Sequence, residues 1–340
     1  MIYRMLLAGT VAVAMAFAPG LRAPTATAEP IKIGVVDVAA FAPVFIAQER
    51  GYFAAEGVPA TLVPFDAAAP IAVATVSGDI DFGVTAVTAA FYNLAGSGEL
   101  KIIAAAAHEA PGFHTQAFLV SRKAYDGGLK TLKDLPGHSF AVTGQGGPPV
   151  YVVGGLIAPK YGFNFNTIRI VPLQTMPNIN SAIAGGRADF TASSLLGKMG
   201  QLVDRGEVKV IAWVGDVAPW QFGLVFTSTK TADSRHDTVE RFLKAYRKGA
   251  RDYHDATTTA DGKPKHGAAE DTVLKIVAKY TKQSLAVVKL AIPYVDADAR
   301  LDVKDVLNQV AFFKSRGLVK PGVDAASTMD MHYVRPLPEK

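Results

Sequence analysis

Short apolar segments rich in β-branched residues recur along the chain, and most precede a segment with the apolar spacing of a helix. The segments predicted to be strands are 31–36, 60–65, 81–84, 101–106, 139–142, 168–171, 188–192, 208–213 and 222–227, and 116–121 is predicted to be an extended apolar stretch. Helices are predicted between them, and residues from Thr238 onward are predicted to be mostly helical. Strands that alternate with helices at this spacing predict parallel βαβ units with right-handed crossovers.

One short pattern occurs twice, at residues 77–85 and 184–193. In both copies a helix is predicted to stop at glycine, and the strand that follows carries Asp-Phe, as Asp81-Phe82 and Asp189-Phe190. The copies lie too far apart for a solenoid repeat. They predict two related α/β lobes, with a chance likeness between two turns as the alternative.

The first 28 residues have the pattern of a secretory signal peptide. Arg4 precedes an apolar, Ala-rich run from Met5 to Phe17, and Ala26-Thr27-Ala28 provides small residues for cleavage. The run is shorter than a membrane span requires, so we expect cleavage after Ala28, and the alternative is an uncleaved anchor. Together with the absence of cysteine, this predicts a periplasmic protein.

Composition excludes several classes of protein and site. The chain has no cysteine, which removes disulfide frameworks, thiolate metal sites and cysteine nucleophiles. With 49% hydrophobic and 19% charged residues, it is not a disordered chain. The 35 Lys and Arg residues only slightly outnumber the 30 Asp and Glu residues and form no basic run, so no nucleic-acid partner is expected.

Three segments carry a resemblance to a known family. They are 33–57, which contains Gly51-Tyr52-Phe53, 76–85, and 132–142. In this order they resemble the sulfonate/nitrate/thiamine-precursor-binding branch of type II periplasmic binding proteins, the solute receptors of ABC importers. The similarity covers most of residues 30–250.

The resemblance implies an α/β fold of two lobes, each a mainly parallel sheet flanked by helices, with ligand held between them. The first lobe is expected to hold 29–116 and 227–340, and the second 117–226. The chain is expected to cross between the lobes at about 116–121 and 222–227. The implied partners are the ligand and the transmembrane subunits of an ABC permease, so contact with the membrane is peripheral, and the receptor is expected to be a monomer.

Ligands of open parallel sheets bind beyond the carboxyl ends of the strands. The candidate ligand residues are those in the loops at these ends and near the crossings: Phe41, Thr85, Val87, His108, Thr143, Gly144, Gln145, Gly146, Ser193, Ser194 and Trp220. Packing in the core is the alternative role for the aromatic residues, and N-capping of a helix is the alternative for Thr85.

The chemistry of these loops favours an anionic ligand. Hydroxyl groups and free backbone amides at helix starts bind anions, and glycines allow close approach of the backbone. The loop at 143–147 is not a nucleotide-binding P-loop, because Pro149 takes the place of its last glycine and no Lys-Ser/Thr follows. Ser193-Ser194 stands where many relatives carry an aromatic residue and an acid, which disfavours a cationic amine.

We therefore expect a receptor for a small organic anion, a sulfonate or a carboxylate, with no catalytic residue, metal or cofactor. The sequence contains neither His-Glu-x-x-His nor Gly-x-Ser-x-Gly, and His108 and His114 are not at a recurring metal-ligand spacing. A neutral pyrimidine or thiamine precursor, stacked on Trp220 or Phe41, is the alternative ligand. A secreted enzyme or a sensor subunit is the alternative from another class of function.

Overall fold

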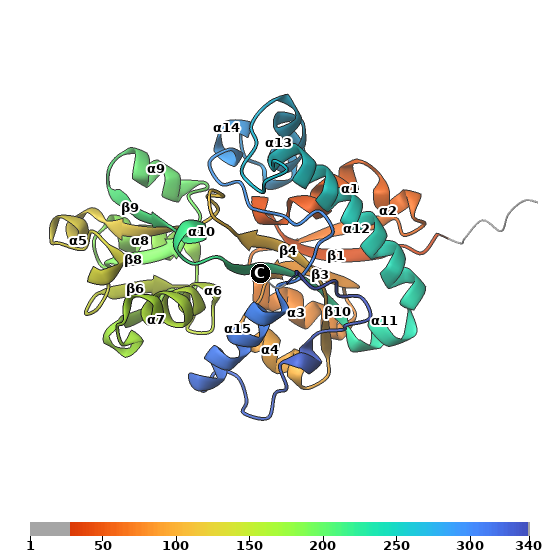
Figure 1. Cartoon of the computed structure of the whole chain (residues 1–340), viewed down its shortest axis with the longest axis horizontal. Helices are drawn as coiled ribbons and strands as arrows, with labels where there is room; N and C mark the ends of the chain where they lie inside the picture. The colour runs from red at the N-terminus through yellow and green to blue at the C-terminus, as the bar shows by residue number, and fades with distance from the viewer. Residues whose placement is uncertain (1–27, 339–340) are drawn as a thin grey trace, which may run out of the picture.

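A computed structural model of the chain describes residues 28–338, so the predicted signal peptide lies outside the described part except for Ala28. The chain forms two α/β lobes, and in Figure 1 the yellow and green lobe lies to the left of the lobe built from both ends of the described chain. Each lobe contains one five-stranded sheet.

The sheet of the first lobe has the strand order β2-β1-β3-β10-β4. Its strands are β1 (Ile31–Val36), β2 (Ala60–Phe65), β3 (Phe82–Ala86), β4 (Leu100–Glu109) and β10 (Trp220–Ser228). β1 is parallel to both neighbours, whereas β10 is antiparallel to β3 and β4. The sheet is therefore mainly parallel, with one reversed strand that comes from late in the chain.

The sheet of the second lobe repeats this plan in the order β7-β6-β8-β5-β9. Its strands are β5 (Ala117–Ser121), β6 (Ser139–Val142), β7 (Arg169–Pro172), β8 (Phe190–Ser193) and β9 (Val208–Trp213). Here β5 is the reversed strand, antiparallel to β8 and β9. The predicted fold class, two lobes with mainly parallel sheets flanked by helices, is confirmed.

The repeated Asp-Phe pattern makes the same contacts in both sheets. The carboxylate of Asp81 accepts the backbone N–H of Lys32 at 2.7 Å, and that of Asp189 accepts the backbone N–H of Ser139 at 2.7 Å. Burial acts to raise the pKa of Asp189, but the hydrogen bonds from Ser139 and the nearby His138 hold that pKa below its ordinary value. Both aspartates thus join neighbouring strands.

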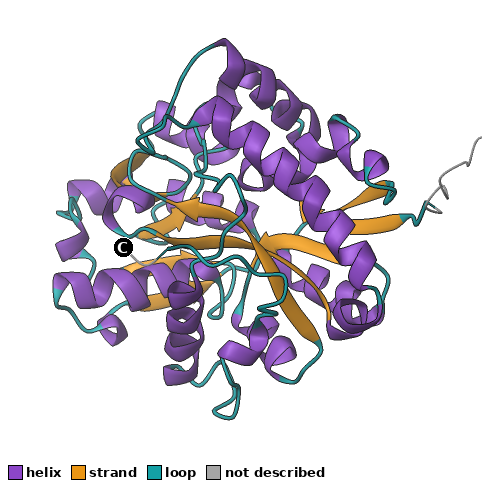
Figure 2. Cartoon of the chain, turned by 45° about the vertical axis from the view of Figure 1, so that its right-hand side comes forward, coloured by secondary structure: helices purple, strands orange, loops and turns teal. Residues whose placement is uncertain are grey.

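Helices cover both faces of each sheet (Figure 2). In the first lobe they are α1 (Ala42–Glu49), α2 (Tyr52–Ala55), α3 (Ala68–Ser77), α4 (Ala89–Gly96), α11 (Thr229–Ser234), α12 (His236–Thr257), α13 (Ala268–Thr281), α14 (Leu285–Val288) and α15 (Val303–Ser315). In the second lobe they are α5 (Arg122–Asp126), α6 (Pro148–Tyr151), α7 (Ala158–Tyr161), α8 (Met176–Ala184) and α9 (Lys198–Asp204). A π-helical turn, η3 (Val152–Ile157), joins α6 to α7, and α10 (Val214–Val217) lies near a crossing. Short 3₁₀ turns are η1 (Ala39–Phe41), η2 (Leu132–Asp134), η4 (Phe165–Thr167) and η5 (Ala326–Thr328).

The chain crosses between the lobes at other positions than predicted. Residues 117–121 form β5 inside the second sheet, and residues 222–227 lie within β10 inside the first sheet. The crossings are the segments 110–116 and 214–219, which lead into these two strands. The two crossings pack tightly against each other at Gly215. A Cβ atom added there would lie only 2.4 Å from the carbonyl oxygen of Ala110 in the other crossing. An apolar run looks the same whether it crosses between sheets or pairs within one, so the pattern alone does not separate a crossing from the strand that continues it.

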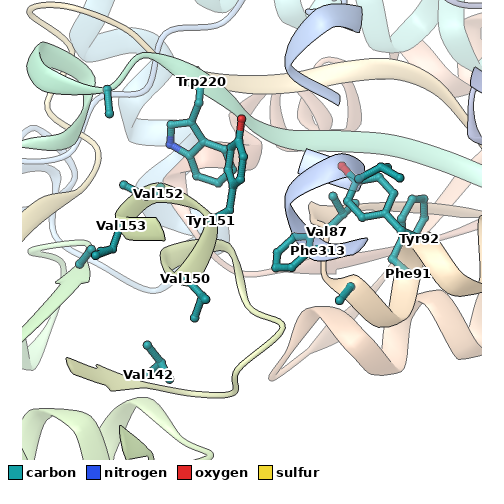
Figure 3. Close-up of a cluster of buried hydrophobic side chains, with 14 of the residues drawn as sticks. Val87, Phe91, Tyr92, Val142, Val150, Tyr151, Val152, Val153, Trp220 and Phe313 are labelled. Atoms are coloured by element: carbon teal, nitrogen blue, oxygen red, sulfur yellow. The ribbon is translucent and has the colours of Figure 1, made fainter. Parts of the chain in front are cut away.

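A single hydrophobic core cluster extends across both lobes on the side of α15 (Figure 3). Tyr151 of the second lobe packs against Trp220 of β10 and Phe313 of α15, with ring centroids 5.7 and 6.4 Å apart. The lobes are thus held together by buried side chains on this side, in addition to the two crossings.

Candidate ligand site between the two lobes

A cavity of about 270 Å³ lies where the lobes meet at the crossings. Its lining comes from the segment after β1, the first crossing, α8, the end of β8 and the loop that follows it, the start of α9, and β10. The residues are Val38, Ala39, Ala40, Thr115, Gln116, Met176, Asn180, Ser193, Ser194, Leu196, Met199, Phe222 and Ala291. Both lobes and the connection between them therefore contribute walls, as expected for a site that opens when the lobes separate.

The wall from the first lobe is the start of a helical segment. β1 ends at Val36, and η1 begins at Ala39 and continues into α1, with Pro43 in the first turn of α1. Ala39 and Ala40 are the first two residues of this segment, so their backbone N–H groups have no acceptor within the helix. This wall therefore offers hydrogen-bond donors and the positive end of a helix dipole.

Three polar atoms at the cavity are buried without a hydrogen-bond partner. They are Thr115 Oγ1 and Gln116 Oε1 from the first crossing and Asn180 Oδ1 from α8. A buried polar atom without a partner costs about 1–3 kcal/mol. The Thr115 hydroxyl can donate or accept, whereas the two amide oxygens only accept, so a ligand that donates to those oxygens would remove their cost and be anchored there.

The wall from the second lobe adds hydroxyl groups. β8 ends at Ser193, which is buried, and Ser194 follows it. The Ser194 hydroxyl accepts the backbone N–H of Leu196 at 3.2 Å and so fixes the turn that leads toward α9. The same two strand-end serines were predicted as ligand residues, and both line the cavity.

The rest of the lining is apolar and uncharged. Phe222 stacks on the buried ring of Phe41 with centroids 6.2 Å apart, and Met199, Leu196 and Ala291 complete this surface. No Lys, Arg, His, Asp or Glu is among the lining residues. The site would therefore hold a ligand through neutral donors and acceptors in an apolar setting.

Glu109 lies buried at the base of the first crossing. It ends β4 opposite Trp220 of β10 and is only 1% exposed. Burial raises the pKa of its carboxyl well above the ordinary value and Asp216 adds to the rise, while the backbone amides of Gln116 and Gly215 oppose it. Neither carboxyl oxygen has a hydrogen bond of good geometry, so burial favours the neutral form of this carboxyl.

The predicted loops at 85–88 and 143–147 contact each other instead of lining the cavity. Ala89 N–H donates to the carbonyl of Gly146 at 3.0 Å, which joins the start of α4 to the second lobe. Thr85 and Val87 are buried, and the hydroxyl that caps α4 belongs to Thr88. None of the candidate ligand residues in these two loops lines the cavity: Thr85, Val87, Thr143, Gly144, Gln145 and Gly146.

The remaining predicted residues also have other partners. Phe41 packs under Phe222, and the ring that lines the cavity is that of Phe222. His108 Nε2 lies 3.2 Å from the carbonyl oxygen of Arg300, and burial lowers the pKa of this imidazole. Trp220 is 3% exposed and packs on Tyr151. Phe41 lies in η1, His108 and Trp220 lie at the paired ends of β4 and β10, and all three side chains are buried.

Sequence reasoning missed Thr115, Gln116 and Asn180. Neutral side chains in a crossing or within an ordinary helix form no motif, and only the fold brings them together. The one available signal was position, since Thr115 directly precedes the crossing predicted at about 116–121 and Gln116 begins it.

The part of the chain that the structure describes contains neither a candidate metal site nor a candidate membrane-spanning helix. No group of three or more His, Asp or Glu side chains there is arranged to hold a metal ion. No helix among residues 28–338 combines the length and the apolar character that a membrane span needs.

The sequence model of the NMT1/THI5-like family matches residues 38–260, more than half of the chain. The chain belongs to the NMT1/THI5-like family. The matched stretch of this NMT1/THI5-like protein contains both crossings and every cavity-lining residue except Ala291. No protein with a curated description matches the sequence significantly.

Solved structures share the fold of this NMT1/THI5-like chain. The alkanesulfonate-binding protein SsuA from Xanthomonas axonopodis pv. citri, bound to MOPS, has a TM-score of 0.69 and 19% identity, over 90% of this chain and 99% of that chain. The aliphatic sulphonate-binding protein SsuA from Escherichia coli gives 0.68 and 17%, over 92% and 94%. The nitrate-binding protein NrtA from Synechocystis PCC 6803 gives 0.61 and 13%, over 88% and 84%. The predicted resemblance to this branch of binding proteins is confirmed.

Proposed function

We propose that this protein is an extracytoplasmic receptor that holds a small solute between its lobes and delivers it to an ABC permease. The observation that carries the proposal is the cavity at the crossings, which both lobes line and in which three buried polar atoms lack partners. Receptors of this architecture close around a ligand, so a site shared by both lobes couples binding to lobe position.

For the solute, we propose a small organic anion with an apolar body and a sulfonate or carboxylate head. No carboxylate lines the cavity, so a cationic amine would be buried without a counter-charge. The head would be held by neutral donors: the N–H groups at the start of η1 and the hydroxyls of Thr115 and Ser193. The relatives named above bind sulfonates and nitrate, which supports an anion.

A neutral heterocycle is the second candidate solute. The lining contains no cationic side chain, and the amides of Gln116 and Asn180 are well suited to the donor and acceptor edge of a pyrimidine-like ring. Phe222 would supply a stacking surface in place of the predicted Trp220 and Phe41. The same cavity walls would hold this second candidate, which differs from the first candidate in having an uncharged head group.

The remaining parts of the proposal concern location and chemistry. The signal-peptide pattern and the periplasmic relatives support export to the periplasm, followed by action as a monomer without cofactor or catalysis. The uncharged cavity supports a binding role because it offers no acid–base pair or activated nucleophile. A sensor subunit on the same fold would bind the same solute and differ only in its membrane partner.

A titration panel separates the solute classes. An alkanesulfonate, the matching carboxylate, the matching sulfonamide, a pyrimidine and an alkylamine are titrated calorimetrically into the mature protein. The sulfonate and carboxylate are expected to bind, and the neutral sulfonamide to bind at least about tenfold more weakly. Binding of the pyrimidine and the sulfonamide, without the anions, would favour the neutral candidate. Binding of the amine alone would contradict both.

Two variants of α8 locate the binding site. Asn180→Ala removes a cavity amide and is expected to weaken binding about tenfold. Asn178→Ala changes the same residue type on the same helix at an exposed position that does not line the cavity, and should leave the affinity unchanged. Equal affinities for both variants and the wild type would contradict the proposed site.

A further inference from the structure

A second and larger hollow lies on the outer surface of the first lobe, away from the cavity between the lobes. This groove of about 860 Å³ runs along α12, between α2 and the C-terminal segment. Its lining residues are Tyr52, Glu240, Leu243, Lys244, Arg247, Lys248, Arg251, Asp252, Asp298, His332, Tyr333, Val334 and Arg335. None of them lines the cavity between the lobes.

Cations outnumber carboxylates in this groove. Five lining residues are Lys or Arg and three are Asp or Glu. The carboxylates nearby are shared: Glu56 pairs with both Lys244 and Lys248, at 2.8 and 2.5 Å. Asp298 is likewise contacted by two arginines of the groove, Arg251 and Arg335. The groove therefore carries an excess of positive charge that its own carboxylates do not neutralise.

Arg247 is the incompletely paired cation at the centre of the groove. Its guanidinium donates to the carbonyl of Tyr333 at 2.8 Å, while its Nε atom is buried without a partner. Among the described residues, no carboxylate lies within ion-pair distance of it. Burial and the nearby Arg335 lower the pKa of Arg247 to about 10, so it stays charged at neutral pH.

The groove is held in shape before any ligand arrives. The backbone N–H of Leu301 donates to the carbonyl of Arg335 at 2.8 Å, and the N–H of Leu337 donates back to Leu301 at 2.8 Å. Tyr333 is buried and its hydroxyl donates to the carbonyl of Ala232 at 2.9 Å. The C-terminal segment is thus fixed along α12 and holds Arg335 beside Arg247.

We propose that this groove binds a multiply charged oxyanion of the phosphate type, centred on Arg247 and Arg335. The guanidinium group of arginine binds phosphate oxygens through paired, charge-assisted hydrogen bonds. Arg247 uses only part of its N–H donors in the bond to the carbonyl of Tyr333. Several cations along one helix fit an anion with more than one charge. The oxyanion is either free or the headgroup of an anionic lipid, and both present the same chemistry to the groove.

Inorganic pyrophosphate is the probe for the site, titrated calorimetrically into the full mature protein at constant ionic strength. The wild type is expected to bind it, Arg247→Gln to weaken binding at least about tenfold and Arg335→Gln several-fold. Arg335 is half-exposed, so its variant tests the site even if Arg247→Gln disturbs the C-terminal segment. Arg122→Gln, an equal change of charge on the second lobe, is the control and should bind like the wild type.

Sedimentation with vesicles then identifies the source of the oxyanion. Binding to vesicles that contain phosphatidylglycerol, but not to pure phosphatidylcholine, and its loss in Arg335→Gln would assign the groove to lipid headgroups. Pyrophosphate binding without vesicle binding would assign it to a free anion. The proposal is overturned if pyrophosphate does not bind the wild type, or if Arg122→Gln weakens binding as much as Arg335→Gln.

Discussion

At the scale of single residues, Asp305 is one of the polar links between the lobes. Its carboxylate, at the start of α15, accepts the hydroxyl of Tyr151 from the second lobe at 2.5 Å. It also accepts the side-chain amide of Gln309 at 2.8 Å and the backbone N–H of Gln221 at 3.0 Å. Burial raises the pKa of Asp305 to about 6 in spite of these bonds.

This raised pKa predicts a dependence of stability on pH. A carboxyl with a higher pKa in the folded state contributes stability below its unfolded pKa, and that contribution is lost as pH rises through about 6. A rise of about two pKa units corresponds to about 3 kcal/mol. In urea titrations, the free energy of unfolding of the wild type relative to that of Asp305→Asn should therefore fall between about pH 4 and pH 7.

The exposed Asp233→Asn is the matched control and should keep the wild-type slope. Glu109, whose pKa is also raised by burial, acts in the same direction and leaves a residual slope in Asp305→Asn. An Asp305→Asn curve that parallels the wild type across this range would show that Asp305 titrates normally.

Individual residues of the candidate site could be predicted only where they lie at the end of a strand that the sequence pattern itself predicts. Ser193 and Ser194 lie at the end of a recognisable strand, and both line the cavity between the lobes. Gln116 and Asn180 come from a crossing and a helix that meet only in the folded chain. Trp220 and His108 have side chains suited to ligand contact, but both are buried within the first lobe.

At the scale of elements, α15 connects the lobes through the π-helical turn η3. Phe312 of α15 packs against this turn, where Gly154 and Gly155 leave room for its ring. A Cβ at Gly154 would lie 2.7 Å from Phe312 Cζ and 2.8 Å from Phe165 Cδ1. The glycine is therefore required by close packing between the lobes.

Gly154→Ala is predicted to lower the free energy of unfolding by about 1–3 kcal/mol, because the added methyl group overpacks this contact. Urea unfolding followed by circular dichroism measures the effect. Gly322→Ala is the control, since a Cβ there meets nothing within 4 Å, and its stability should equal or slightly exceed that of the wild type. Equal stability of the two variants would mean that α15 does not pack on η3 as described.

Most elements could be predicted, because alternating apolar segments and glycine stops are local signals. The strands at 31–36, 60–65, 139–142 and 208–213 have the predicted bounds. The segments of β5 and β10 were predicted to be extended, but their antiparallel pairing within the two sheets was not, since pairing with a distant strand leaves no local mark. The helix predicted between the strands at 188–192 and 208–213 begins at Lys198, after Gly197 turns the chain with a φ of 69°.

At the scale of the whole molecule, the chain has two separate candidate binding regions. The cavity between the lobes is neutral and small, whereas the groove along α12 is charged and open on one side of the first lobe. The two regions share no residue, so variants of one should leave the other intact. The central claim is that the solute binds at the crossings and is held by both lobes together.

Hydrogen–deuterium exchange, measured by mass spectrometry with and without the solute that binds most tightly in the panel, tests this claim most directly. The account predicts slower exchange on binding in three segments at once: residues 38–41, the first crossing at 110–116, and 193–199. These segments come from both lobes and the connection between them. Slower exchange confined to one lobe, or to α12 and the C-terminal segment, would contradict the account.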